Sequence, residues 1–435
     1  MKTRNRFTAG LFFTFILLLQ PFTFGQGGSL VPPGPPEPTM RSLQELWEKM
    51  DALETRATAL ELQNVSIQTQ NISLRQQVGL LAGALVNFAW NLYRVDTDYV
   101  GITDTSLAFG PDGHPAISYN NQAIGGHTLN FARYDGTAWT LTIVDSGNGV
   151  GGYNSLRFGA DGQPAIAYYD QVSGRLKFAR YDGAAWEITI VDTGLLGADT
   201  GAYCSLAFGP DNQPAIAYYD VTNTDLRFAR FDGANWIRTI VDDGGPDGVG
   251  EYCSLVFGPD GQPAISARHT ELGLRFARFD GNAWQLSVAD PDISSGYHTS
   301  LAFGPDGEPA ISHFVVPGNR LRLARFNGSF WGMSGVTPDT ETVVGYNSLA
   351  FGPDGQPMIA YAGGSNVHLK IARRVETSGG INSSSWDITV VDESPLVGHH
   401  NSLVFGPDGQ PAISYYDNAN YDLKFARKGV FRIGQ

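Results

Sequence analysis

One short string, Ser-Leu-x-Phe-Gly, occurs seven times along the chain and constrains its fold more than any other feature. The first five intervals between successive copies are 46 to 50 residues long, and the last is 54. A near-constant period of this length is typical of a propeller or another array of small units, because each unit buries its apolar face only by packing on its neighbours. The copies begin at Ser106, Ser155, Ser205, Ser254, Ser300, Ser348 and Ser402.

Each unit contains four runs of strand-like composition. Gly-Pro-Asp-Gly or a close variant joins the first two runs. An Asp-Gly pair such as Asp182-Gly183 joins the last two, which is a strong signal for a hairpin. Four short antiparallel strands per unit are typical of the blade of a β-propeller. In the second unit the runs cover 155–158, 164–169, 175–181 and 186–191.

The seventh unit lacks a fourth run at its expected place. Six units end in a run that begins with Trp, whereas the seventh ends soon after Lys424-Phe425-Ala426-Arg427. A matching run, 89–96, precedes the first unit. We therefore expect an all-β fold, a seven-bladed β-propeller over residues 90–435, in which an N-terminal outer strand completes the last blade and covers its edge. The six tryptophans are Trp139, Trp186, Trp236, Trp284, Trp331 and Trp386.

The first 40 residues indicate an export signal and a linker. Residues 1–25 combine a basic start, an apolar run and small residues near Gly25, as signal peptides do. An uncleaved anchor is the alternative, although the apolar run is short for one. Residues 26–40 are rich in Pro and Gly and predict an extended linker. We expect an exported protein, extracellular, at the cell surface or periplasmic, without a transmembrane span.

Residues 41–89 carry a heptad pattern. Apolar side chains such as Leu53 and Leu60 recur at alternating spacings of three and four residues, and Asn64 and Asn71 occupy two of the core positions. This pattern predicts an α-helical coiled-coil stem through which the chain self-associates, as a dimer or a trimer. A single amphipathic helix packed on the next domain is the alternative.

Composition excludes several classes of partner and site. The formal net charge of −14 disfavours nucleic acid, because binding to phosphates needs a basic face. The two cysteines exclude a disulfide framework, and the histidines lack the short spacings of zinc motifs, so we expect no metal and no cofactor. Cys204 and Cys253 occupy equivalent positions in neighbouring units, where a disulfide or two free thiols are both possible.

The repeats resemble a known group of proteins. Segments such as Ala167-Tyr168-Tyr169-Asp170 are similar to the repeats of exported bacterial propellers loosely grouped with the sialidase-like, Asp-box superfamily, and the resemblance covers the whole ring. The Asp-box turn is Ser-x-Asp-x-Gly-x-Thr-Trp, whereas residues 181–186 are one residue tighter and lack the Ser. The sialidase catalytic set has no recognisable counterpart. The resemblance therefore implies the fold and says little about activity.

One face of the propeller is expected to carry the binding surface. The connections between the second and third strands, and those between blades, vary in length, whereas the other turns are nearly identical, and binding sites usually lie on variable loops. Two positions before each repeat Ser stands Asp104 or an aromatic residue, expected to surround the mouth of the central channel. Flat rings with polar tips suit sugars, although each could instead pack between neighbouring blades. These ligand-binding candidates are Tyr153, Tyr203, Tyr252, His298, Tyr346 and His400.

A second set of candidates comes from a sector that departs from the repeat. The second strand ends in Tyr-Tyr-Asp in three units, but in different residues in three consecutive units, the fourth to the sixth. Arg268, His269 and His313 lie there and are further candidate ligand contacts. Arg suits a carboxylate or sulfate on an acidic glycan. Neutral drift within the repeat is the alternative.

These features predict a non-enzymatic binding or adhesion protein that presents one propeller face on an oligomeric stalk, with a glycan or surface polymer as its partner. Near-identical units suit multivalent recognition. A glycoside hydrolase or lyase that uses blades 4 to 6 is one alternative, and a structural component of a surface or matrix is another. Catalysis needs an asymmetric group such as a carboxylate pair, whereas the aspartates here mostly recur in every unit.

Overall fold

A computed structural model describes residues 44, 45, 47–60, 62, 63, 66, 67, 70, 74, 89–97, 101–122, 126–194, 197–376 and 384–429. The expected signal peptide and linker, residues 1–40, lie outside this set. The chain divides after residue 70 into an N-terminal unit and the propeller unit, which are treated separately below.

The N-terminal unit is helical. Every described residue between 44 and 70 has α-helical conformation. Core positions of the heptad pattern are exposed in the single chain, with Leu53 at 58% and Leu60 at 60%. Within the described residues no helix has the length and apolar content that crossing a membrane requires.

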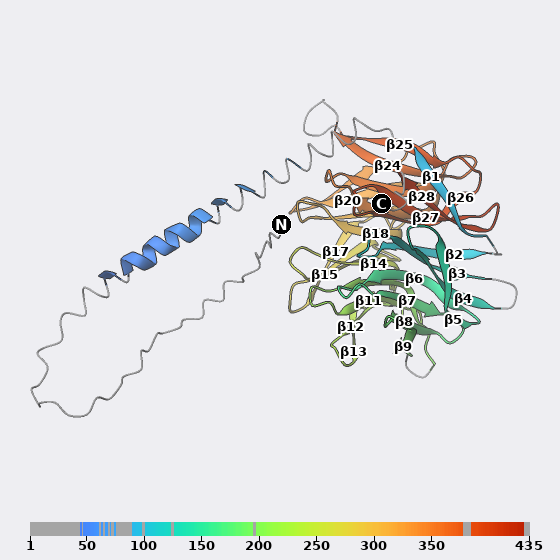
Figure 1. The fold of residues 1–435 in the computed structure, drawn as a ribbon, viewed down its shortest axis with the longest axis horizontal. Coiled ribbons are helices and arrows are strands. Elements are labelled where there is room, and N and C mark those ends of the chain that lie inside the picture. Colours follow the sequence, from blue (N-terminus) through green and yellow to red (C-terminus); the bar gives the residue numbers. More distant parts are fainter. Residues whose placement is uncertain are drawn as a thin grey trace, which may run out of the picture. The chain divides into compact units, whose positions relative to one another are not determined.

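The propeller consists of seven four-stranded antiparallel sheets, one per blade (Figure 1). In the first six blades the first strand is innermost, because it contacts the first strands of the neighbouring blades, and the fourth strand is outermost. Blade 1 contains β2 (Ile102–Phe109), β3 (Pro115–Asn121), β4 (His127–Tyr134) and β5 (Trp139–Gly147), and blade 2 contains β6 (Val150–Phe158), β7 (Pro164–Asp170), β8 (Arg175–Tyr181) and β9 (Trp186–Asp192). Blade 3 contains β10 (Thr200–Phe208), β11 (Pro214–Asp220), β12 (Asp225–Phe231) and β13 (Trp236–Asp242), and blade 4 contains β14 (Val249–Phe257), β15 (Pro263–His269), β16 (Gly273–Phe279) and β17 (Trp284–Asp290). Blade 5 contains β18 (Tyr297–Phe303), β19 (Pro309–Val315), β20 (Arg320–Phe326) and β21 (Trp331–Gly335), and blade 6 contains β22 (Val343–Phe351), β23 (Pro357–Gly363), β24 (His368–Glu376) and β25 (Ser384–Asp392).

Blade 7 combines the two ends of the propeller sequence. It contains β26 (Val397–Phe405), β27 (Pro411–Asp417) and β28 (Asp422–Lys428), followed on its outer side by β1 (Trp90–Asp96). β1 pairs antiparallel with β28, and Trp90 stands opposite Lys428. Figure 1 shows β1 in light blue among the red strands of this blade.

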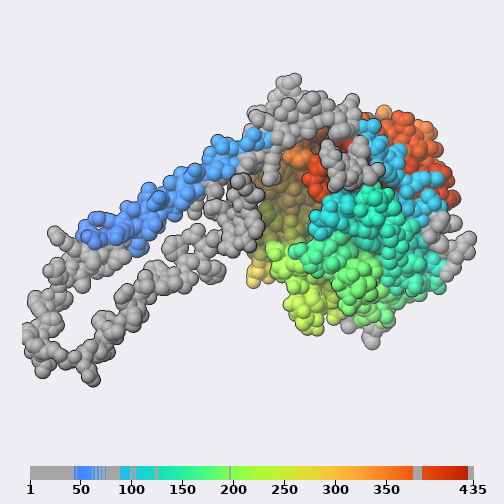
Figure 2. Space-filling view, in the orientation of Figure 1, coloured from blue at the N-terminus to red at the C-terminus, as the bar shows by residue number. Residues whose placement is uncertain are grey.

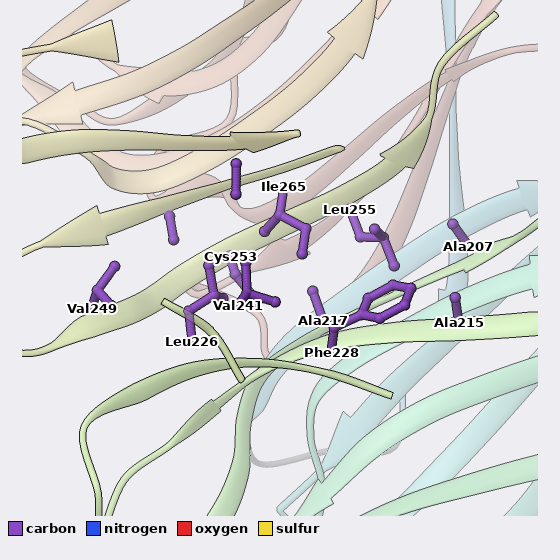
Figure 3. Close-up of a cluster of buried hydrophobic side chains, with 12 residues drawn as sticks. Ala207, Ala215, Ala217, Leu226, Phe228, Val241, Val249, Cys253, Leu255 and Ile265 are labelled. Atoms are coloured by element: carbon purple, nitrogen blue, oxygen red, sulfur yellow. The ribbon is translucent and has the colours of Figure 1, made fainter. Parts of the chain in front are cut away.

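The hydrophobic core lies between blades rather than within them. Each of the seven buried clusters contains side chains from two adjacent blades, as in Figure 3, where Ala217, Leu226 and Phe228 of blade 3 pack with Leu255 and Ile265 of blade 4. Blades that follow each other in sequence are therefore neighbours in space, as the order of colours in Figure 2 shows. A single unit cannot bury its own apolar faces, which is why this sequence folds as an array.

The repeat Ser links the inner strands of adjacent blades. The hydroxyl of Ser205 accepts a hydrogen bond from the backbone N–H of Leu255, 3.0 Å away. The equivalent bond between Ser402 and the N–H of Leu107, at 3.1 Å, joins blade 7 to blade 1. The other five bonds are Ser106–Leu156, Ser155–Leu206, Ser254–Leu301, Ser300–Leu349 and Ser348–Leu403.

The tight turns on one face are also held by recurring contacts. Arg230 pairs with Asp211 of its own blade at 2.7 Å and lies over the ring of Phe257 in the next blade, 5.0 Å from its centroid. An Arg–Asp pair of this kind occurs in all seven blades, so most of what repeats on this turn face stabilises the ring. The other six pairs are Arg133–Asp112, Arg180–Asp161, Arg278–Asp260, Arg325–Asp306, Arg373–Asp354 and Arg427–Asp408.

The two cysteines are free thiols, and the disulfide considered from the sequence is not formed. Each thiol instead donates a hydrogen bond to a backbone carbonyl of the preceding blade: Cys204 to Tyr153 at 3.0 Å and Cys253 to Tyr203 at 2.8 Å. Equivalent positions of neighbouring blades point in the same rotational sense, so each sulfur faces the backbone of the preceding blade rather than the other sulfur. Burial raises the pKa of both thiols, which therefore stay protonated and able to donate.

Candidate functional site

Six aromatic side chains follow one another around the propeller axis, with tilted rings in four successive pairs and a T-shaped arrangement in the pair His298–Tyr346. Successive ring centroids lie 3.9 to 4.6 Å apart, a spacing at which the rings are in contact. We call this group, with Asp104, the collar; its aromatic members are Tyr153, Tyr203, Tyr252, His298, Tyr346 and His400. The residues expected at the mouth are thus in direct contact with one another, and each also bridges two blades.

Asp104 occupies the seventh place in the collar. One carboxylate oxygen accepts a hydrogen bond from the backbone N–H of Tyr153 at 2.9 Å, and the other lies 3.4 Å from Nδ1 of His400. The collar therefore continues across the junction between blades 7, 1 and 2. Every blade contributes one member to it.

The backbone of the collar is held in an unusual conformation. Tyr203 has a φ of 53°, and Tyr153, Tyr252, His298 and His400 have φ between 48° and 56°. Such values are costly for residues with a large side chain, and they persist only where neighbouring contacts fix them. Here the residue after each collar member donates a hydrogen bond to the carbonyl of the collar member in the preceding blade. The donors are Thr105, Asn154, Cys204, Cys253, Thr299, Asn347 and Asn401. The rings are consequently positioned before any ligand arrives.

The collar separates two cavities. A funnel of about 750 Å³ lies on the side of the variable loops, and its lining includes Gln122 after β3, Gln171 after β7 and Asp199 before β10. A smaller cavity of about 180 Å³ lies on the channel side, lined by the collar and by the residues that follow it, such as Cys204 and Thr299. The funnel is large enough for a small oligosaccharide or another ligand of drug size.

Polar groups and further aromatic rings surround the collar within the funnel. Tyr169 and Tyr219, at the ends of β7 and β11, place their rings 6.1 and 6.2 Å from those of Tyr153 and Tyr203. The hydroxyl of Tyr169 donates to Asp199 at 2.5 Å. The lining also contains Glu251, on the inner strand of blade 4. These two tyrosines and two acids were not identified as site members from the sequence. The recurring Tyr-Tyr-Asp string could have pointed to the tyrosines, whereas the acids do not recur from unit to unit.

Burial fixes the protonation states of the collar. It raises the pKa of Tyr153 and Tyr346 to about 12, and it raises those of Tyr203 and Tyr252. It lowers the pKa of His298 to about 4 and that of His400 to about 3. At neutral pH all six aromatic members are uncharged, so the collar offers hydroxyls and neutral imidazoles as hydrogen-bonding groups.

The candidates of the atypical sector lie elsewhere. His313 is fully buried, and its Nε2 lies 3.0 Å from Asp290 of the preceding blade. At the equivalent positions in blades 2 and 3, the hydroxyl of Tyr218 donates to Asp192 at 2.7 Å. His313 thus replaces a tyrosine in a recurring contact between blades and does not line the funnel. Burial disfavours the charged form of Asp290, but hydrogen bonds, with His313 the largest contributor, bring its pKa to about 2.

His269 and Arg268 also have structural partners. His269 is 4% exposed, and its Nδ1 accepts the backbone N–H groups of Glu271 and Leu272, each at 3.2 Å, so it holds the turn after β15. Arg268 donates to Glu251 at 2.9 Å and stacks on Tyr297, with 4.4 Å from its guanidinium carbon to the ring centroid. Of Arg268, His269 and His313, only Arg268 therefore lies next to the funnel, because it contacts the lining residue Glu251.

Another cavity, of about 800 Å³, lies between blades 3 and 4 at the turn face. It is lined by Arg230, Phe257 and Trp284, among others. These side chains belong to the contacts that recur between blades. The collar and funnel, by contrast, combine a shared scaffold with loops that differ from blade to blade, and this makes them the better candidate site.

No protein-family model matches the chain, and no curated protein matches its sequence. Similar solved structures include AofleA from Arthrobotrys oligospora, with 15% identity over 70% of this chain and 90% of that one and a TM-score of 0.46. The fucose-specific lectin from Aleuria aurantia has 17% identity over 69% and 98%, with a TM-score of 0.44. The intramolecular trans-sialidase from Ruminococcus gnavus has 15% identity over 79% and 98%, with a TM-score of 0.43. Likeness of this degree carries no argument about function.

Proposed function

We propose that this chain is an exported, non-enzymatic binding protein that recognises glycans in the funnel and presents the propeller on an oligomeric stem. The observation that carries the proposal is the collar: stacked, uncharged aromatic rings, held in place by hydrogen bonds between all seven blades, at the floor of a cavity of about 750 Å³.

The chemistry of the funnel suits a sugar. A sugar ring has apolar C–H faces that pack on aromatic rings and hydroxyls that need hydrogen-bond partners. The funnel supplies both, through the collar and through polar side chains such as the exposed amide of Gln171. Because the collar is already fixed by contacts between blades, little conformational entropy is lost when a ligand binds, and this favours affinity.

The stem adds valency. Leu53 and Leu60 lie at core positions of the heptad pattern and are more than half exposed in the single chain. Apolar side chains at this spacing are buried when helices of two or three chains associate. Several funnels on one stem would then bind a surface that carries many copies of a glycan with greater avidity than one funnel.

A glycan array probed with the chain from residue 26 onward, stem included, tests the proposal. We expect binding to a restricted set of glycans, and at least tenfold weaker binding by Gln171→Ala and Tyr219→Ala, which alter the funnel. Gln410→Ala, an amide removed from the turn face, is the matched control and keeps full binding. The proposal fails if the array shows no bound glycan, which favours a structural role, or if a bound glycan is cleaved, which favours the enzyme.

A further inference from the structure

The funnel carries negative charge. Asp104, Asp199 and Glu251 belong to its lining, and none of the lining residues that the structure describes is Lys or Arg. Of the lining histidines His127, His298 and His400, the last two add no positive charge at neutral pH, because burial lowers their pKa values to about 4 and about 3. A ligand that enters the funnel therefore meets the carboxylate of Asp199, with no lysine or arginine in the lining, and that of Glu251, which is paired with Arg268 beside the lining.

The cation next to the funnel is already neutralised. Arg268 has a side chain that is 12% exposed, donates to Glu251 at 2.9 Å, and stacks on Tyr297. A carboxylate or sulfate on a ligand would have to compete with Glu251 for this guanidinium. The structure thus opposes the acidic glycan that Arg268 suggests when the sequence is considered alone.

The collar tyrosines lie in the field of these acids. Burial is the largest cause of the raised pKa values of Tyr203 and Tyr252, and the charge of Glu251 raises both further. Asp104 acts in the same direction on Tyr153 and Tyr346. Aromatic rings next to carboxylates are a favourable environment for an ammonium group, which gains from both cation–π attraction and charge-assisted hydrogen bonds.

We propose that the funnel selects glycans with a free amine, that is, amino sugars in the ammonium form, and discriminates against glycans with carboxylate or sulfate groups. This proposal rests on the proposed function and narrows its ligand class. The ammonium would interact with the carboxylates of Glu251 and Asp199, while the sugar ring packs on the collar.

Chemical N-acetylation of the array separates this proposal from the broader one. Acetylation removes the charge of each amine and leaves linkages and hydroxyl configurations unchanged. We expect the strongest signals to come from glycans with free amines and to fall at least tenfold after acetylation. Before acetylation, these signals should also weaken as salt is raised, because screening reduces the attraction between charges. Binding that is unchanged by acetylation, or strongest for acidic glycans, overturns the ammonium proposal but supports glycan binding; an array without any bound glycan overturns both.

Two substitutions locate the selectivity. Glu251→Gln removes one carboxylate and releases Arg268, so the preference for the free amine over its acetylated form should fall at least tenfold and binding of acidic glycans should rise. Asp199→Asn keeps an acceptor for Tyr169 and should reduce the preference by a smaller factor, which provides a readout if Glu251→Gln folds poorly. Glu187→Gln makes the same change of charge on the exposed outer strand β9 and should leave the preference intact. Unchanged selectivity in both funnel variants contradicts the assignment.

Discussion

Ser118 donates a hydrogen bond to Asn154 across the junction of blades 1 and 2, with 2.5 Å between Oγ and Oδ1. The same two positions are matched around the ring: a Ser in one blade faces Asn or Thr in the next, as in Ser312–Asn347, Ser266–Thr299 and Ser414–Thr105. Where the first position is Ala, at Ala167 and Ala217, the second is Cys. The exception is Asn401 of blade 7: the matched position in blade 6 is Ala360, and the buried Oδ1 of Asn401 has no hydrogen-bond partner.

Ala360→Ser should therefore stabilise the protein. The new hydroxyl would stand where Ser118 and Ser312 stand in their blades and would donate to the Asn401 Oδ1. We expect about 1 kcal/mol of added stability, the usual contribution of such a hydrogen bond. Urea unfolding followed by tryptophan fluorescence measures it. Ala217→Ser is the matched control: it faces Cys253, which offers no such acceptor, and should destabilise the protein instead.

Closure of the ring can be tested through the repeat Ser. Ser205→Ala leaves the buried N–H of Leu255 without its partner and should cost about 1–3 kcal/mol. Ser402→Ala removes the equivalent bond to Leu107 between blades 7 and 1 and should cost about as much. Both costs come from the same unfolding measurement. A clearly smaller cost for Ser402→Ala would mean that the last and first blades are less tightly joined than the others.

His298 should make the protein acid-sensitive. Its pKa is about 4 in the folded state, below the usual value of about 6.5 for an unfolded chain, so unfolding takes up a proton between these values. Its contribution to stability is intact above pH 6.5 and is lost as the pH falls towards 4. His298→Tyr, which places the residue of four other blades at this position, should reduce the loss by about 2–3 kcal/mol. Unfolding free energies of both proteins at pH 7 and pH 4.5 provide the comparison; equal losses would contradict the buried, neutral histidine.

The stem should determine the number of chains in the assembly. Leu53→Ser combined with Leu60→Ser places two hydroxyls in the predicted seam between helices and should convert the oligomer to monomers, without changing the thermal unfolding of the propeller. Light scattering after size-exclusion chromatography gives the mass. Leu62→Ser is the matched control, because Leu62 is 67% exposed and lies outside the seam positions. A monomeric parent chain would exclude the predicted association.

The blades could be predicted because their signals are local and repeated. The outer strands and turns of the second unit agree with the predicted runs to within one residue, but its inner strand begins at Val150 rather than Ser155. The added part contains Gly151 and Tyr153, both with positive φ, and two shifts of pairing register, so it lacks the alternation by which strands are recognised.

The site was predictable only in part. The collar positions followed from their fixed distance to the repeat Ser, whereas the stack they form depends on contacts between blades. Asp199 and Glu251 could not be assigned, because their place in the funnel depends on connections that occur once each. The contact of His313 could not be predicted for a related reason: a histidine in place of a tyrosine suggested a ligand contact, whereas the structure shows its imidazole next to an aspartate, as the phenol is in other blades.

The pairing of β1 with β28 has a mechanical consequence. β1 begins at Trp90, so a pull applied along the chain from its N-terminal side loads this strand first. The force is then carried by the hydrogen bonds between two strands from opposite ends of the propeller sequence. In a tethered protein, this one pair of strands would limit the load that the ring can bear before its seventh blade opens.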